Sequence, residues 1–212
     1  MDVVESQVVE FTKALQAHAA TYQVALTDGT IQGLGEYYAL LTAWNTHLHL
    51  VAFASAQEFA TRHVLESLLL LKYLPQGARI ADLGSGGGLP IIPCLIARAD
   101  VRVVLIEASK KKAVFLREVL RETDTKARAT VIAERFEELT TPAVDFVTCR
   151  ALERFESMLQ RLLIWVPTPC TLLLFGGEGL GTVIDDSGLS SDRILIPKSA
   201  RRFLFIVSKT SN

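Results

Sequence analysis

A short apolar segment that breaks into glycines and then resumes as a helical segment constrains the fold of this chain most. Residues 79–83 are largely apolar and short enough for a buried strand, and glycines follow at positions 84, 86, 87 and 88. Residues 90–97 fit a helix, because a proline in the first turn leaves no helical hydrogen bond unmade. A strand, a tight turn and a helix in this order predict one unit of an α/β fold.

The same alternation continues towards the C-terminus. Four further strands are expected, at Arg102–Ile106, Ala129–Ile132, Val144–Cys149 and Thr171–Phe175. Ser109 fits the N-cap of the helix that follows the first of these strands. Two last strands, Arg193–Ile196 and Phe203–Val207, are expected to pair antiparallel at one edge. We therefore predict a mostly parallel sheet covered by helices on both faces.

The first 75 residues have the three- and four-residue spacing of amphipathic helices. Helices are expected at residues 4–15, 37–48 and 56–74, and the Thr27-Asp28-Gly29-Thr30 segment predicts a turn between the first two. The 212 residues fit one large domain or a domain with an appended arm. We predict an N-terminal helical extension at residues 1–75, packed on a core at residues 76–212.

The charges nearly cancel, since 22 Lys and Arg face 23 Asp and Glu. Nothing in this balance requires a nucleic acid or an anionic membrane, so any contact with a polyanion must be local. The candidate phosphate-contacting cations are Lys110, Lys111, Lys112, Arg117 and Arg121 on one expected helix and the pair Arg201 and Arg202. A solvated helix face is the alternative interpretation of the first cluster, because most charge runs are of that kind.

Neither a membrane span nor a metal site is expected. The longest uncharged stretch, residues 37–57, is interrupted by Asn45, His47 and His49, which suits a bilayer poorly. The three cysteines form no C-x-x-C pair, and all four histidines precede them, which argues against zinc. The first residues lack the basic start and apolar stretch of a secretory signal, so we expect reduced cysteines and a cytoplasmic protein.

The spacing of the glycines indicates what the loop can bind. Gly84, Gly86 and Gly88 form G-x-G-x-G after an acidic residue, whereas a dinucleotide site would prefer G-x-G-x-x-G and this chain has Leu89 in the last position. The spacing favours S-adenosylmethionine (SAM); another nucleotide and a purely structural turn are the alternatives. Glu107, at the end of the next strand, can accept hydrogen bonds from ribose hydroxyls, or it is an exposed strand-end residue.

Together these residues resemble the bacterial small-subunit ribosomal RNA guanine-N7 methyltransferases, also called glucose-inhibited division protein B. The resemblance covers about residues 37–152. The matching segments are Trp44-Asn45, Arg62–Leu68, the DLGSGGGLPIIP run at 82–93, Ile106–Lys112 with Phe115-Leu116, Arg135–Glu138 and Arg150-Ala151.

The resemblance implies a Rossmann-like class I SAM-dependent methyltransferase that acts on ribosomal RNA. The cofactor-binding residues would be Gly84, Ser85, Gly86, Gly88, Leu89, Glu107, Phe136, Glu137 and Arg150. Among these, Gly84 and Leu89 would line the SAM tail, Glu107 would hold the ribose, and Phe136 with Glu137 would border the adenine. His63, Glu66 and Ser67 would lie on a helix near the site. RNA would contact Lys110, Lys111, Lys112, Arg201 and Arg202.

Guanine N7 carries a lone pair and no proton, so we assign no catalytic base and take Arg150 as the candidate that orients the base or a phosphate. The chain departs from the family pattern at three places. Glu66 stands where the family has Asp, His49-Leu50-Val51 stands for N-L-T, and Phe175-Gly176 stands where the family has Lys-Gly. These departures keep open a SAM-dependent methyltransferase of another RNA or a small molecule, and an inactive SAM-binding module.

Overall fold

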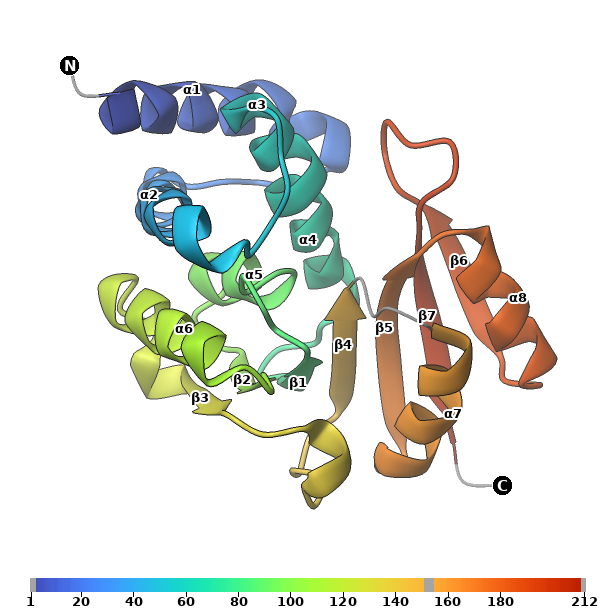
Figure 1. Cartoon of the computed structure of the whole chain (residues 1–212). Helices are drawn as coiled ribbons and strands as arrows, with labels where there is room; N and C mark the ends of the chain where they lie inside the picture. The colour runs from blue at the N-terminus through green and yellow to red at the C-terminus, as the bar shows by residue number, and fades with distance from the viewer. Residues whose placement is uncertain (1–2, 151–154, 211–212) are drawn as a thin grey trace.

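The computed structural model describes residues 3–150 and 155–210 and contains one seven-stranded sheet in the order β3-β2-β1-β4-β5-β7-β6 (Figure 1). The strands are β1 (Arg79–Leu83), β2 (Arg102–Ile106), β3 (Ala129–Ile132), β4 (Phe146–Arg150), β5 (Cys170–Gly176), β6 (Ser191–Leu195) and β7 (Phe203–Lys209). All neighbouring strands are parallel except that β7 runs antiparallel to both β5 and β6. The predicted sheet, with its antiparallel pair at one edge, is confirmed.

Helices cover both faces of the sheet because its strands bury alternate residues on opposite sides. One hydrophobic cluster includes Leu173 and the helices α1 (Val3–His18), α2 (Asp28–Leu48), α5 (Ile91–Ala97) and α6 (Lys110–Glu122). The other includes Leu172 and Leu174 with α7 (Phe155–Trp165) and α8 (Glu178–Asp186). The N-terminal helices thus share one apolar core with the sheet, and β5 contributes to both clusters.

The turn predicted at residues 27–30 is wrong, because α2 begins at Asp28. Thr27 is its N-cap, and the Thr27 hydroxyl accepts a hydrogen bond from the Thr30 amide at 3.1 Å. One glycine inside this helix, Gly33, serves close packing. A Cβ at Gly33 would lie 2.9 Å from Cγ2 of Ile96 on α5, so glycine lets the two helices approach.

The helix predicted at residues 56–74 is an irregular helical segment. It consists of α3 (Ala56–Glu58), the π-helix η2 (Phe59–Leu65), α4 (Glu66–Leu68) and the 3-10 helix η3 (Leu69–Tyr73). Further 3-10 turns are η1 (Ala19–Tyr22), η4 (Lys126–Arg128) and η5 (Phe136–Glu138). Among the residues described, no helix is long and apolar enough to cross a membrane.

Candidate functional site

The register of the parallel strands brings the predicted site residues to one edge of the sheet. Leu83 at the end of β1 pairs with Ile106 at the end of β2 and with Cys149 near the end of β4. Ile106 pairs in turn with Ile132 at the end of β3. The segments that follow these strands therefore leave the sheet at the same level, where open α/β sheets bind their ligands.

The glycine loop follows β1 and uses backbone conformations that side chains rarely adopt. Gly84, Gly86 and Gly88 have φ angles of 65°, 50° and 85°. A Cβ at Gly88 would overlap Cγ1 of Ile92, so close packing against α5 also requires glycine there. Ser85 is buried, and its hydroxyl donates back to the Asp82 carbonyl at 3.0 Å. The loop is thus held as a compact turn at the start of α5.

Glu107 fastens this loop to the next strand. Its Oε2 accepts a hydrogen bond from the Gly86 amide and its Oε1 accepts one from the Ser109 amide, each at 2.8 Å. Ser109 caps α6, as predicted, and its hydroxyl accepts from the Lys112 amide. Each carboxylate oxygen can accept two hydrogen bonds, so Glu107 can still accept hydrogen bonds from the hydroxyl groups of a ribose. Its side chain lies against the loop and does not stand as an exposed strand-end residue.

Asp82 is a site residue that the sequence interpretation did not assign. It is fully buried at the carboxyl end of β1, and neither carboxylate oxygen has a hydrogen-bond partner among the described residues. Burial and the nearby Glu107 carboxylate raise the pKa of Asp82 well above its usual range. A buried carboxyl without a partner is costly unless a ligand satisfies it. An acidic residue inside an apolar strand, two positions before the first glycine, is the sequence signal that marks it.

Tyr37 and Val51 form the side of the loop that faces the N-terminal helices. The buried hydroxyl of Tyr37 on α2 donates to the Gly87 carbonyl at 2.6 Å. A Cβ at Gly87 would lie 2.8 Å from Cγ2 of Val51, so the loop packs directly on the segment that follows α2. Burial raises the pKa of Tyr37, which keeps its hydroxyl protonated and able to donate. Sequence spacing alone gave Tyr37 only a place on a helix face.

The segment after β3 carries the two residues expected near the adenine. Phe136 is buried and packs edge-to-face on Trp165, with ring centroids 5.5 Å apart. Trp165 also donates from its indole nitrogen to the Leu139 carbonyl at 2.9 Å. Glu137 is exposed, and its Oε1 lies 3.8 Å from Nη1 of Arg161 on α7. Their contact with an adenine stays a prediction, as does the contact of the largely buried Leu89 with the SAM tail.

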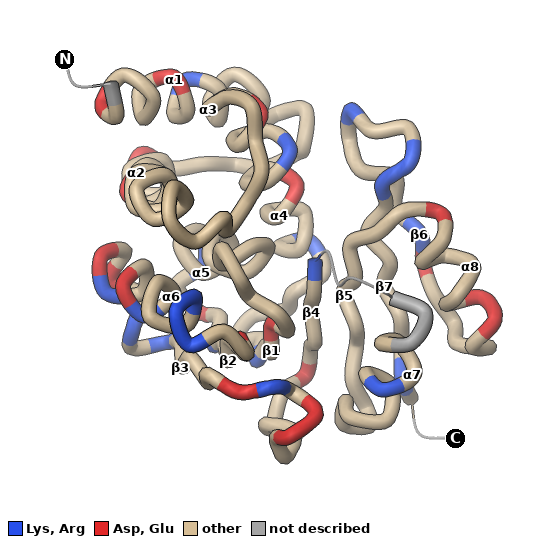
Figure 2. The backbone as a smooth tube through the Cα atoms, in the orientation of Figure 1, with Lys and Arg blue, Asp and Glu red and all other residues tan. Residues whose placement is uncertain are grey.

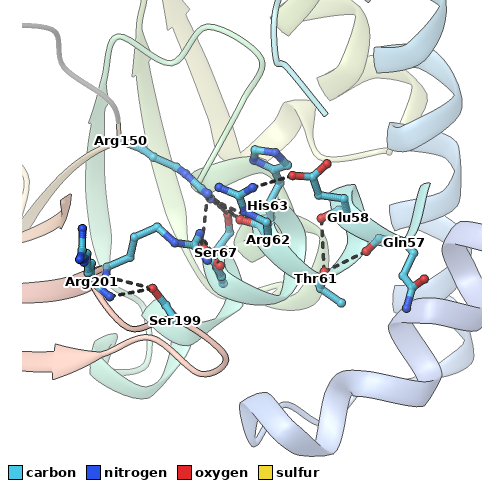
Figure 3. Close-up of polar contacts among 11 residues, drawn as sticks. Gln57, Glu58, Thr61, Arg62, His63, Ser67, Arg150, Ser199 and Arg201 are labelled. Atoms are coloured by element: carbon cyan, nitrogen blue, oxygen red, sulfur yellow. Dashed lines mark hydrogen bonds and ion pairs between the residues drawn. The ribbon is translucent and has the colours of Figure 1, made fainter. Parts of the chain in front are cut away.

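Arg150 ends β4 and extends towards the π-helix (Figure 3). Its Nη2 donates to the Arg62 carbonyl at 2.6 Å, and its Nη1 donates to the His63 carbonyl at 3.2 Å. The same nitrogens reach the Glu66 carboxylate at 3.3 Å and the Ser67 hydroxyl at 3.4 Å. The guanidinium thus satisfies backbone groups of a helical turn whose hydrogen bonding is irregular. Its predicted contact with the cofactor or the target base is untested; Ala151, its partner in the motif, lies outside the described residues.

Glu66 joins Arg150 to the loop between β6 and β7. Its side chain is 1% exposed, and its Oε1 lies 2.6 Å from Nη1 of Arg202. Burial raises the pKa of Glu66, although both arginines act in the opposite direction. Phe175 stands in the Phe175-Gly176 pair where the family has Lys-Gly. Cζ of Arg150 lies over the Phe175 ring, 5.6 Å from its centroid. Arg202 shares this one carboxylate with Arg150, and its expected contact with RNA stays a prediction.

The similarity to known proteins agrees with this geometry. A family model described as rRNA small subunit methyltransferase G matches residues 30–178. Ribosomal RNA small subunit methyltransferase G of Sorangium cellulosum (strain So ce56) is 39% identical over 166 residues, 75% of this chain and 69% of that protein. The Wolinella succinogenes protein of the same name is 30% identical over 193 residues, 91% of this chain and 97% of that protein. The chain belongs to the rRNA small subunit methyltransferase G family.

Some relatives match over a shorter segment. The protein of this name from Xanthomonas axonopodis pv. citri is 43% identical over 124 residues, so the matched part spans 58% of that relative. Solved structures show the shared fold. A SAM dependent methyltransferase from Aquifex aeolicus, 16% identical, has a TM-score of 0.55 and covers 67% of this chain and 88% of that one. P. horikoshii TYW2 in complex with MeSAdo, 13% identical, has a TM-score of 0.59 and covers 77% of this chain and 67% of that one.

Membership of the family makes this protein a SAM-dependent methyltransferase, and the residues at the carboxyl edge fit the cofactor. When bound, SAM supplies an electrophilic methyl group on a positively charged sulfur. The orphaned Asp82 carboxylate suits a cationic amine, and the loop at Gly84, Gly86 and Gly88 lets a ligand approach the backbone closely. Glu107 offers acceptors for hydroxyl groups at the same edge.

The basic residues expected to contact RNA differ in how their charges are balanced. Lys110, Lys111 and Lys112 form the first turn of α6 (Figure 2). None of the three lysines takes part in an ion pair within the described chain. Arg121, about three turns further along α6, is paired with Glu118 and Glu122 at 2.6 and 2.7 Å. The lysine cluster therefore retains a local positive charge next to Glu107, whereas Arg121 does not.

Two further basic residues, Arg117 and Arg201, belong to the candidate cations. Arg117 is exposed and donates to the Val131 carbonyl at 3.2 Å, so its guanidinium lies over β3. Arg201 is exposed in the loop between β6 and β7, where its amide donates to the Ser199 hydroxyl (Figure 3). Contact of Arg201 and of the lysine cluster with RNA stays a prediction.

Proposed function

We propose that this protein transfers a methyl group from SAM to N7 of a guanine in small-subunit ribosomal RNA. One observation carries the proposal within this family. Glu107 holds the glycine loop through the Gly86 amide, and the unpaired charges of Lys110–Lys112 begin three residues later. A site for the methyl donor and a local attraction for phosphates thus share one edge of a nearly neutral protein.

The proposed reaction needs positioning more than proton transfer. Guanine N7 has an in-plane lone pair and no proton to lose, so no residue of this chain is required as a general base. Holding the nucleophile in line with the methyl carbon contributes about 7 to 11 kcal/mol through orientation and avoided solvent reorganisation. Asp82 would contact the amine of SAM and Glu107 the ribose hydroxyls, groups that do not change during transfer, so we assign both residues to binding and not to rate.

Arg150 acts in this proposal as a positioning residue. Its donors are engaged by the carbonyls of Arg62 and His63 and by the side chains of Glu66 and Ser67. The guanidinium therefore holds the π-helix against the carboxyl end of β4, beside the strand that carries Asp82. This arrangement supports a role in shaping the pocket wall on which the target base would rest.

Transfer from labelled SAM tests the proposal directly. Unmodified small-subunit ribosomal RNA is expected to gain one methyl group, located at N7 by chemical cleavage that is specific for N7-methylguanine. Large-subunit ribosomal RNA and pools of small molecules are the parallel substrates. Labelling of only those substrates would favour the alternative that Phe175 keeps open, a methyltransferase with another acceptor. Cofactor binding without transfer to any substrate would support an inactive module.

A further inference from the structure

A cleft of about 280 Å³ opens at the amino ends of the central strands, on the edge of the sheet opposite the glycine loop. Four basic residues line it. Arg79 and Arg102 are the first residues of β1 and β2 and are register partners. Lys126 and Arg128 come from η4, directly before β3, which pairs with β2. The parallel register therefore gathers cations from three successive segments. No acidic residue lines the cleft among the residues that the structure describes.

The charges of these cations are only partly balanced. Arg79 is offset by Asp145, to which its Nη2 and Nε donate at 2.6 and 3.0 Å. Arg102, Lys126 and Arg128 take part in no ion pair among residues 3–150 and 155–210. Three of the four cations that line the cleft thus have no direct ion-pair partner among these residues.

Arg128 is the best-placed of these cations to bind an anion. It is half-buried, and its Nη1 donates to the Arg98 carbonyl at 2.9 Å, which fixes the guanidinium at the cleft. Two carboxylates lie near enough to act on its charge: Asp100, which is already held by Arg98 at 2.6 Å, and Asp124, which forms no ion pair with Arg128 within the described residues. A partly desolvated guanidinium attracts an anion more strongly than a fully hydrated one, and its planar fork suits the oxygens of a phosphate.

We infer that this cleft binds a backbone phosphate of the RNA substrate, at a point separate from the methylated guanine. The inference rests on the proposed function. Five-residue strands span about 16 Å, so a phosphate at the amino edge belongs to a different nucleotide from one at the carboxyl edge. The cleft has room for a phosphate and its sugar, whereas ligand pockets for whole cofactors usually exceed about 300 Å³. Two separated contacts would fix the orientation of the protein on a folded RNA.

Salt-dependent RNA binding tests the inference with the variant Arg102→Ala/Lys126→Ala. Both side chains are exposed, so the variant is expected to fold and to bind SAM as the wild type does. The control Lys13→Ala/Lys72→Ala removes two exposed cations from the N-terminal helices. The probe is unmodified small-subunit ribosomal RNA, titrated between about 50 and 200 mM KCl. The cleft variant is expected to lower the slope of log affinity against log salt by about 1 to 2, and the control by less than about 0.5.

The outcomes separate the inference from the proposed function. An unchanged slope in the cleft variant, with methyl transfer to the RNA intact in the wild type, would overturn the inference alone. Wild-type protein that neither binds nor methylates the RNA would overturn both. Inorganic phosphate and a mononucleotide are titrated separately by NMR. Tight binding of either at Arg128, with the RNA slope unchanged, would assign the cleft to a small molecule and overturn the RNA contact.

Discussion

At the scale of single residues, burial decides the state of the groups next to the proposed site. His63 lies on the π-helix, and its Nδ1 is buried without a hydrogen-bond partner among the described residues. Burial, with the positive charge of Arg150 as a second cause, lowers the pKa of His63 to about 4. A cationic imidazole would add a third positive charge beside Arg62 and Arg150, so the network is built around a neutral histidine.

The protein is expected to lose stability in acid partly because of His63. The unfolded chain takes up a proton at this residue near pH 6.5, whereas the folded protein does so only near pH 4. The contribution of neutral His63 is therefore fully present above about pH 6.5 and is lost as the pH falls towards 4, by at most about 3 kcal/mol. Urea unfolding of the wild type and of His63→Gln at a series of pH values measures this difference.

The comparison of the two curves isolates His63 from other buried groups. Glu66 and Asp82 have raised pKa values, so their contributions to stability change with pH in the opposite direction to that of His63. Both groups are present in the wild type and in His63→Gln, so their contributions cancel when one curve is subtracted from the other. The matched control is His47→Gln, since His47 is exposed. A wild type and a His63→Gln variant with parallel stability curves between about pH 4 and 7 would contradict the account of this residue.

At the scale of elements, the N-terminal helices belong to the site because they support the glycine loop. Tyr37 holds the Gly87 carbonyl, and Val51 closes the space that a Gly87 side chain would need. Asn45 fixes the segment after α2 by donating to the Val51 carbonyl and accepting from the Val51 amide. These two hydrogen bonds explain why an asparagine suits the second position of the Trp44-Asn45 motif, near the end of α2.

Tyr37→Phe is expected to weaken both folding and cofactor binding. The substitution leaves the Gly87 carbonyl without its buried donor, which costs about 1 to 2 kcal/mol in the free energy of unfolding. A less ordered loop should also lower SAM affinity, by roughly three- to tenfold. Urea unfolding and calorimetry measure the two effects. Tyr73→Phe is the control, and equal stability and affinity in both variants would show that the hydroxyl of Tyr37 does not support the loop.

Sequence patterns predicted elements well where one physical signal dominated. The strands at Arg102–Ile106 and Ala129–Ile132 are found with the predicted bounds, because short apolar runs between polar turns leave little choice. The beginning of α2 was missed because Asp28 and Gly29 favour turns in isolation. Only the packed structure shows that Gly33 allows α5 to approach, since this contact joins segments about sixty residues apart.

At the scale of the whole molecule, a net charge of −1 hides an uneven distribution. Motifs predicted the cofactor edge, since its glycines and Glu107 lie within 24 residues of one another in the chain. Pairings between distant segments were beyond such reasoning. Arg202 contacts Glu66 across 136 positions. Arg128 and Arg102 line the same cleft because β3 pairs with β2. The fold thus decides which cations are balanced by carboxylates and which retain their charge.

Replacing Lys110, Lys111 and Lys112 by alanine is expected to reduce the salt dependence of RNA binding. These cations lack ion-pair partners within the described residues, and each phosphate contact that is lost lowers the slope by up to about 0.9. SAM affinity should change little, because the cap of α6 is made by Ser109 and not by the lysines. A slope equal to that of the wild type would remove the lysine cluster from the RNA-binding surface.

Calorimetric titration of SAM into the wild type and into Gly86→Asp tests whether the glycine loop is the cofactor site. An aspartate at this position would be strained at a φ of 50° and would place a second carboxylate near Oε2 of Glu107, inside the loop. Gly188→Asp is the matched control, because Gly188 has a φ of 71° and open space around it. We expect SAM to bind the wild type and the control. We expect no binding to Gly86→Asp, although this variant remains folded. Undiminished binding to Gly86→Asp would contradict the assignment of the glycine loop as the cofactor site.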